Sequence, residues 1–273
     1  MANCCPLVIA DLQVFEPGVE GYPRRLLALG LSRTLHVRGA LCAGPTIAIV
    51  GARAATGDGM LRAHAIARHL AERGVHVVSG GALGIDGAAH RGALAGGGAT
   101  TVVLGSGVDI AYPSRHAQLF EEVVLRGGAL VSQFPIGMTP RASTFTQRNT
   151  LISALADAVI VVEADLKSGS LSTAQAARRQ GRVVAAWPGT PGCARLLATG
   201  AAVVENADDA LALAAGTPRH PTLAALDEIA TAVRDAIAAG ASGIDAIVRH
   251  TGLPVRAVLR ALPQLELSSA RMQ

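Results

Sequence analysis

The sequence predicts an α/β protein built on a doubly wound, mostly parallel sheet. From Thr46 to about Gly216, short β-branched segments that are apolar throughout alternate with longer amphipathic segments. Strands without a polar face are typical of parallel sheets that helices cover on both sides. Hydrophobic residues make up 50% of the 273 residues and charged residues 16%, which supplies enough apolar surface for a sizeable core.

Seven segments are predicted as strands because they are rich in β-branched residues and bounded by turn residues. They cover residues 46–50, 75–79, 100–104, 129–132, 158–163, 182–187 and 201–205. Amphipathic segments between them, such as 60–74 and 116–128, have the apolar spacing of helices. Together they predict a Rossmann-like domain over residues 44–216.

Two further regions flank this domain. Residues 1–43 are expected to form an N-terminal lead-in, a small helical region with one short helix over 21–30. Prolines within 217–222 predict a linker. Residues 217–273 then show an amphipathic helix, two short helices around the break at 251–254, and a brief strand over 264–267. This order predicts a winged-helix or helix-turn-helix-like domain.

Composition narrows the possible functions. The net charge of +4 is compatible with a polyanionic partner without requiring one. Of the 24 lysines and arginines all but Lys167 are arginines; this suits phosphate binding, but a GC-rich genome is the simpler explanation. The four cysteines lack the spacing of a zinc site. We find neither a signal peptide nor a long apolar segment, and therefore expect a cytoplasmic protein without membrane association.

Small residues and hydroxyls follow several of the predicted strands. Because ligands bind outside the carboxyl ends of strands in an open parallel sheet, these residues predict an anion site made of backbone N–H groups and helix N-termini. Arg53 and Lys167 supply formal positive charges, and Arg148 with Asn149 begins a helix suited to gripping phosphate oxygens. Each loop alone also fits a plain tight turn, and Arg148 also fits a structural pairing with Glu163 or Asp157.

No cofactor or catalytic set is evident. The strand at 46–50 lacks the glycine fingerprint of a dinucleotide site, and the P-loop and nucleophile-elbow patterns are absent. Asp86 and His90 have the spacing of a metal pair or an ion pair, but without a third ligand we expect them to brace the pocket. The sequence predicts a binding pocket with no metal, not an enzyme.

Six motifs in order resemble the DNA-processing protein A (DprA/Smf) family. They are YPRRL, IAIVGARAAT, VVSGGALGIDGAAHRGAL, LGSGVDIAYPSRH, FTQRNTLISAL and VVEADLKSGSLSTAQAA, and the resemblance covers about residues 20–205. Family members bind single-stranded DNA and load the RecA recombinase onto it during natural transformation, commonly as homodimers. The resemblance therefore implies the same partners here: single-stranded DNA, RecA and a second copy of the chain.

The resemblance also implies where the DNA phosphates bind. The positions matching the family motifs are Gly51, Arg53, Ser79, Gly80, Gly81, Arg148, Asn149, Lys167, Ser168, Gly169 and Ser170. Glycines in this set are expected to let backbone amides approach a phosphate, with Asp86 and His90 as structural support. Binding through phosphates should depend on salt and be largely indifferent to sequence.

The chain departs from the family pattern at two motif positions. Gln133 stands where the family has glutamate, and Thr150 stands where it has a second arginine, which predicts one phosphate contact fewer and weaker DNA affinity. These departures leave it open whether RecA loading is retained. Two alternatives remain: an enzyme that hydrolyses nucleoside monophosphates, although the 187–190 segment lacks its glycine pair, and a nucleotide sensor whose helix-turn-helix binds duplex DNA.

Overall fold

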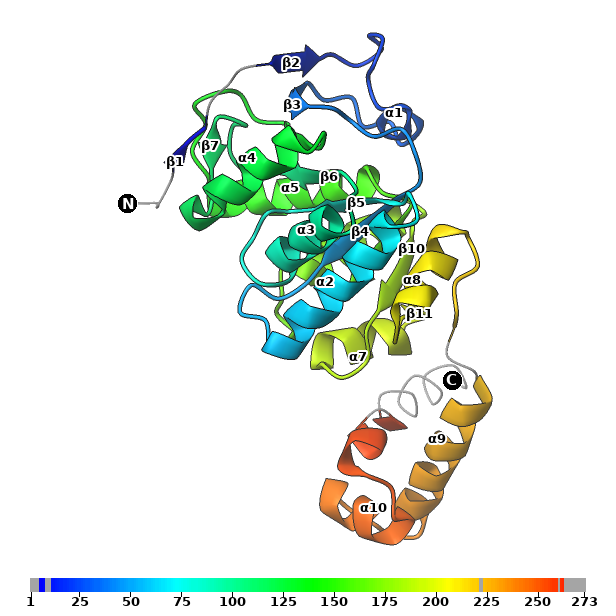
Figure 1. The fold of residues 1–273 in the computed structure, drawn as a ribbon. Coiled ribbons are helices and arrows are strands. Elements are labelled where there is room, and N and C mark those ends of the chain that lie inside the picture. Colours follow the sequence, from blue (N-terminus) through cyan, green and yellow to red (C-terminus); the bar gives the residue numbers. More distant parts are fainter. Residues whose placement is uncertain (1–4, 8–10, 221–222, 260, 263–273) are drawn as a thin grey trace.

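The computed structural model describes residues 5–7, 11–220, 223–259 and 261–262 (Figure 1). Its centre is a nine-stranded sheet with the strand order β11-β10-β9-β4-β5-β6-β8-β3-β2. The first parallel strand in the sequence, β4, lies in the middle, and later strands are added on both sides of it. This order reverses between β4 and β9, which is the topological switch point of a doubly wound sheet.

All seven predicted strands are confirmed as the parallel part of this sheet. They are β4 (Thr46–Val50), β5 (His76–Ser79), β6 (Thr100–Val103), β8 (Ala129–Ser132), β9 (Ala158–Val161), β10 (Val183–Ala186) and β11 (Ala202–Val203). Nearly all of their residues are buried, as continuous apolar strands in a covered parallel sheet should be.

Residues 1–43 contribute strands that their sequence pattern did not predict. The sheet is extended beyond β8 by β3 (Leu35–Gly39) and β2 (Leu12–Phe15), both antiparallel to their neighbours. A second, two-stranded sheet pairs β1 (Cys5–Pro6) with β7 (Ile110–Ala111). The short helix expected in this region is α1 (Arg24–Ala28).

Helices cover both faces of the sheet. On one face lie α2 (Gly57–Ala71), α3 (Ile85–Ala95), the 3-10 turn η1 (Ser114–His116), α4 (Ala117–Leu125) and α8 (Ala207–Ala214). On the other lie α1, α5 (Ala142–Ala154), α6 (Ser170–Arg179) and α7 (Pro191–Ala198). Alternate strand residues, such as Val77 and Val78, enter opposite cores.

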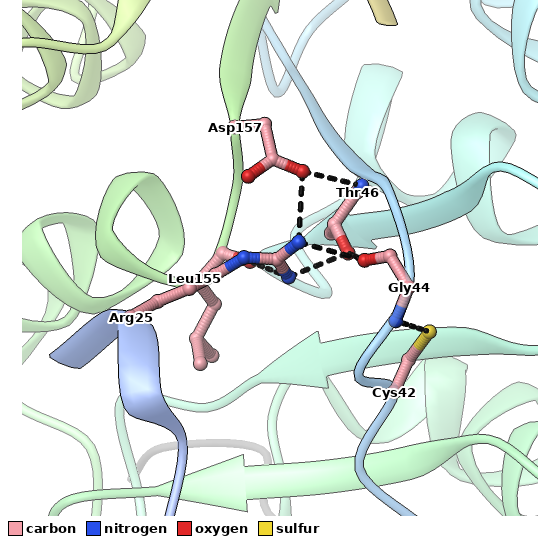
Figure 2. Close-up of polar contacts among 6 residues, drawn as sticks. All are labelled: Arg25, Cys42, Gly44, Thr46, Leu155 and Asp157. Carbon is pink, nitrogen blue, oxygen red and sulfur yellow. Dashed lines mark hydrogen bonds and ion pairs between the residues drawn. The ribbon is translucent and has the colours of Figure 1, made fainter.

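Arg25 joins α1 to the amino-terminal edge of the central strands (Figure 2). Its guanidinium donates to the Asp157 carboxylate at 2.8 Å and to the carbonyls of Gly44 and Leu155. It also donates to the Thr46 hydroxyl, while the Thr46 N–H donates to Asp157. One arginine therefore anchors α1 to the starts of β4 and β9, at the edge opposite the candidate site.

The C-terminal segment forms its own small core. It contains the helices α9 (Leu223–Ala238) and α10 (Ile244–Thr251) (Figure 1) and helical residues 255–259. Their buried residues include Val233, Ile247 and Val258. The predicted helix–turn–helix order is thus present, and the strand expected over 264–267 lies outside the described residues. None of the described helices has the length and apolarity needed to cross a membrane.

Candidate functional site

A cavity of about 570 Å³ opens at the carboxyl edge of the sheet; we call it the edge cavity. It is lined by the loops that follow β4 and β9 and by residues of α5 and α6. These loops belong to the two strands at the switch point, where the diverging connections leave a crevice. The lining residues are Val50, Gly51, Ala52, Arg53, Ala54, Ala82, Asp86, Arg148, Asn149, Ile152, Asp165, Lys167, Ser168, Gly169, Ser170 and Thr173.

Most of the predicted site residues therefore line one cavity. The exceptions are the turn after β5 and His90. Ser79 is buried and donates its hydroxyl to the Ile49 carbonyl at 2.5 Å. Gly81 has a φ of +69°, and a Cβ there would come within 2.8 Å of both Phe120 and Val102. These two residues shape the turn from behind the cavity wall.

Gly80 makes room for the charged floor of the edge cavity. A Cβ at this position would collide with the guanidinium of Arg148 and would lie 2.7 Å from Asp86 Oδ2. Arg148 is 4% exposed and donates from Nη1 to the Val103 carbonyl at 2.9 Å. The alternative pairings of Arg148 do not form, since Asp157 pairs with Arg25 and Glu163 accepts from Thr56.

Asp86 and Arg148 are buried next to each other beneath Gly80 without a direct hydrogen bond between them. Asp86 is 5% exposed and accepts from the Ala82 N–H at 3.3 Å. Burial raises the pKa of Asp86, with Arg148 acting in the opposite direction. Burial also lowers the pKa of Arg148 to about 10, so this side chain keeps its positive charge at neutral pH. The floor of the cavity thus holds a fixed cation.

His90 supports α3 rather than the edge cavity. It is fully buried, and its Nδ1 is 2.9 Å from the Thr100 hydroxyl, which donates to the Val77 carbonyl. Burial lowers the pKa of His90 to about 3, which keeps the ring neutral. Asp86 and His90 therefore lie one turn apart on the same face of α3 and hydrogen-bond to different partners, the Ala82 N–H and the Thr100 hydroxyl.

An aromatic pair lies beside the charged residues. The ring centroids of Tyr112 and Phe145 are 5.4 Å apart, and the guanidinium carbon of Arg53 is 4.9 Å from the Phe145 centroid. Arg53 is exposed and Phe145 partly exposed. Neither aromatic was predicted as a site residue; the position of Phe145 one helical turn before Arg148 was the available signal.

The loop before α6 forms the opposite wall. The hydroxyls of Ser168 and Ser170 are 2.7 Å apart, and Ser170 begins α6, so the positive end of that helix borders the cavity. Asn149 donates to the Gly169 carbonyl and to the Ser172 hydroxyl, at 3.2 and 2.7 Å. Asn149 therefore holds this loop against α5.

Gly51 has a packing reason to be glycine. A Cβ at Gly51 would lie 2.5 Å from Ile85 Cγ1 and 2.9 Å from the Glu163 carbonyl oxygen. The absent side chain lets the loop after β4 contact α3 and the end of β9. Ala52 then donates its N–H to the same carbonyl at 2.7 Å, which fixes the start of the loop that carries Arg53.

The cavity carries unpaired positive charge. Arg53 and Lys167 are both exposed, and neither makes an ion pair with a described residue. With Arg148 on the floor and the α6 N-terminus at the wall, the arrangement favours a phosphate or another anion. The two acids in the lining are Asp86, which opposes Arg148, and Asp165, which accepts from the Leu166 N–H.

The two departures from the family motifs meet away from this cavity. Gln133 and Thr150 line a separate small void with Leu26, Leu31, Arg33 and Leu151. Neither residue belongs to the lining of the edge cavity. Thr150 itself therefore does not contact the edge cavity, although the residue before it, Asn149, does.

The chain is similar in sequence to known protein families and to individual proteins. Residues 14–215 match the family described as DNA recombination-mediator protein A, and residues 217–269 match the DprA winged helix domain. A putative DNA processing protein DprA of Mycobacterium tuberculosis is 43% identical over 263 residues, which is 90% of this chain and 66% of the relative. Protein Smf of Escherichia coli is 42% identical over 189 residues, or 68% of this chain and 49% of that protein.

The chain thus spans from about half to just under two thirds of the length of these relatives. Two solved structures share its fold. DNA processing protein A of Streptococcus pneumoniae has a TM-score of 0.69 at 33% identity and covers 75% of each chain. DNA processing protein A of Helicobacter pylori has a TM-score of 0.67 at 29% identity, and the match covers 76% of this chain and 98% of that one. Its structure concerns the single-stranded DNA binding mode of that protein.

Proposed function

The chain belongs to the DNA recombination-mediator protein A family, and from this premise we propose that it binds single-stranded DNA in the edge cavity. The observation that carries the proposal is the joint presence of unpaired cations in one cavity and a partly exposed aromatic pair beside one of them, Arg53. Arg53 and Lys167 are free to neutralise phosphates, and the α6 N-terminus adds backbone N–H groups.

Single-stranded DNA fits this site better than duplex DNA. Phe145 and Tyr112 present partly exposed rings next to Arg53, which suits the face of an unpaired base. Bases in a duplex are stacked on one another and cannot offer that face to a side chain. The combination of stacking and phosphate contacts supports binding with little sequence preference.

Gly169 supports the proposal because the protein itself gives no reason for a glycine there. Its φ is negative, and a Cβ would meet no atom within 4 Å. Gly80 and Gly81, by contrast, are required by packing. An unneeded glycine at the cavity wall is the position where a ligand's phosphate can approach the backbone closely.

We propose a binding protein rather than an enzyme. A nucleotide hydrolase would need an available carboxylate in the cavity, and Glu163 is held by the N–H and hydroxyl of Thr56. Asp86 is buried against Arg148. Asp165 is the exposed carboxylate of the cavity, and the described lining residues include no histidine and no second exposed acid to act with it.

From family membership we also propose the larger role. The bound strand is DNA taken up in natural transformation, which the protein protects and passes to RecA recombinase. The chain acts as a homodimer, with residues 44–216 as the DNA-binding domain, 1–43 as its lead-in and 217–273 as a separate winged-helix domain. The family's description as a recombination mediator supports this role.

The test compares two single-arginine variants in binding to a fluorescent oligo(dT). Arg53→Ala should lower affinity at least about tenfold, since a charge-assisted contact contributes about 1.5–3 kcal/mol. Arg126→Ala is the matched control, because Arg126 is also exposed but follows α4 at the opposite edge of the sheet. Equal affinities for both variants and the unaltered chain would remove the edge cavity from DNA binding.

A further inference from the structure

The single tryptophan of the chain lies at the carboxyl edge of the sheet but outside the edge cavity. Trp187 is the first residue after β10, and its N–H donates to the Val161 carbonyl at 2.9 Å. Its ring is partly exposed. The guanidinium carbon of Arg62, on α2, lies 5.1 Å from the ring centroid, a cation–π contact.

The loop that carries Trp187 is tied to the wall of the edge cavity. Ala164 donates its N–H to the Thr190 hydroxyl at 3.1 Å, and its carbonyl accepts from the Gly192 N–H at 2.9 Å. The next residue, Asp165, lines the cavity. Since β10 and β4 are separated only by β9, their ends lie about 10 Å apart at the usual strand spacing.

The local charges leave the outer side of the pair open to a DNA strand. The Arg62 side chain is 41% exposed, and its neighbour Asp58 is 4.0 Å away on the preceding helical turn. The carboxylate of Glu163, two residues after β9, accepts from the N–H and hydroxyl of Thr56 at the start of the same helix. Arg62 therefore covers the indole with a flat cationic group that still faces solvent.

We propose that the Arg62–Trp187 pair is a second contact for single-stranded DNA, on which the base of a nucleotide neighbouring the edge cavity stacks. This inference rests on the proposed function of the cavity. Guanidinium and indole planes are the groups on which unpaired bases stack, and Arg62 adds a charge for the adjoining phosphate. Arg53 and Phe145 form a second arginine–aromatic pair, and Arg53 itself lines the cavity.

The first measurement uses the unaltered chain. Because Trp187 is the only tryptophan, its emission reports on this site alone. Titration with a ten-nucleotide oligo(dT) should quench the emission in step with the anisotropy of a labelled copy of the same oligonucleotide. Unchanged emission at an oligonucleotide concentration that saturates the anisotropy would overturn the inference and leave the proposed function standing. No anisotropy change would overturn both.

The second measurement compares two variants of α2. Arg62→Ala should weaken binding of the same oligo(dT) about five- to tenfold, the usual loss for one stacked base. Arg68→Ala is the control, since Arg68 lies on the same helix and also pairs with an acid four residues away. It removes the same charge farther from the cavity and should change affinity less than about twofold. If both variants lost the same affinity for oligo(dT), Arg62 would contribute only its charge, and the proposed stacking would be contradicted.

Discussion

Gly169 is the single residue at which binding and stability can be separated most cleanly. A methyl group there meets no protein atom, so Gly169→Ala should leave the thermal midpoint unchanged or slightly raised. The same methyl group would occupy the approach to the backbone at the start of α6. We expect oligo(dT) affinity to fall about tenfold, which corresponds to one lost close contact.

Gly44→Ala supplies the control for this prediction. Gly44 is also free of a left-handed φ, and a Cβ there would make only an ordinary 3.7 Å contact with Cys42 Sγ. It lies beside Arg25 at the opposite edge of the sheet (Figure 2). Unaltered DNA affinity in Gly169→Ala would show that no phosphate approaches the α6 N-terminus.

Three buried histidines, His76, His90 and His116, have lowered pKa values and link stability to pH. Burial lowers the pKa of His76 to about 4 and that of His90 to about 3. Because both values lie below the ordinary 6.5, the unfolded chain binds more protons than the native one. The neutral histidines therefore contribute fully to the free energy of unfolding above about pH 6.5. As the pH falls from there towards the native-state pKa values, each histidine's contribution decreases by about 1.4 kcal/mol per pH unit.

Urea unfolding at pH 7, 6 and 5 measures this effect. Asp86, whose pKa is raised, changes stability in the opposite direction, so the comparison is made against a variant in which only a histidine is altered. Between pH 6 and pH 5 the free energy of unfolding of His90→Gln should decrease by about 1.4 kcal/mol less than that of the unaltered chain. Parallel declines in the two proteins would mean that His90 is charged in the native state.

At the scale of elements, the parallel strands were predictable because burial on both faces leaves continuous apolar segments. The seven segments are mostly apolar, with their few polar residues mainly at the ends, and they alternate with segments of helical spacing, which predicts a doubly wound sheet. The strands β2 and β3 were missed for the complementary reason. They pair antiparallel, and β2 is largely exposed at the sheet edge, where LQVF is too short to show a clear alternation.

Part of the candidate site was also predictable from the sequence. The rule that ligands bind at the carboxyl ends of parallel strands brought Arg53, Lys167 and the 168–170 loop together from sequence alone. The sequence could not show that Ser79 and Gly81 face the core, because a glycine required by packing looks the same as one required by a ligand. Nor could it place Phe145 against Arg53, a contact between segments far apart in the chain.

The turn between β5 and α3 should be sensitive at Gly80. A methyl group at this position would collide with Arg148, which the Val103 carbonyl holds in place, and would press on Asp86. Gly80→Ala should therefore lower the free energy of unfolding by about 1–3 kcal/mol and weaken oligo(dT) binding as Arg148 is displaced. Chemical denaturation measures the first effect and anisotropy the second.

Gly57→Ala, at the start of α2, is the control for Gly80→Ala. Gly57 begins α2 with ordinary backbone angles, and a Cβ added there would have no atom within 4 Å. We expect a stability change within about 0.5 kcal/mol. Equal stabilities of Gly80→Ala and Gly57→Ala would contradict the placement of Arg148 beneath the turn.

At the scale of the whole molecule, the structure indicates where the C-terminal segment can be removed. Arg219 is attached to the sheet region although it follows α8. Its carbonyl accepts from the Val203 N–H at 2.7 Å, and its guanidinium pairs with Glu205 and Asp209. A fragment of residues 1–220 should therefore remain folded and bind oligo(dT) as the full chain does. A fragment of residues 1–216 should melt about 2–4 °C lower, since it loses a backbone hydrogen bond and an ion pair.

Thermal unfolding and anisotropy of the two fragments and the full chain check this expectation. Loss of DNA binding in the 1–220 fragment would mean that the winged-helix segment takes part in the interface. Identical melting of the two fragments would mean that Arg219 contributes nothing to the edge strand β11.

The measurement that tests the central claim most directly is the binding of fluorescent oligo(dT), against a duplex of equal length, at two salt concentrations. We predict tighter binding of the single strand and a slope of log affinity against log salt of about −1.4 or steeper, at about −0.7 for each phosphate neutralised by Arg53 and Lys167. Equal affinity for both DNAs, or an affinity that does not change with salt, would contradict a single-strand phosphate site in the edge cavity.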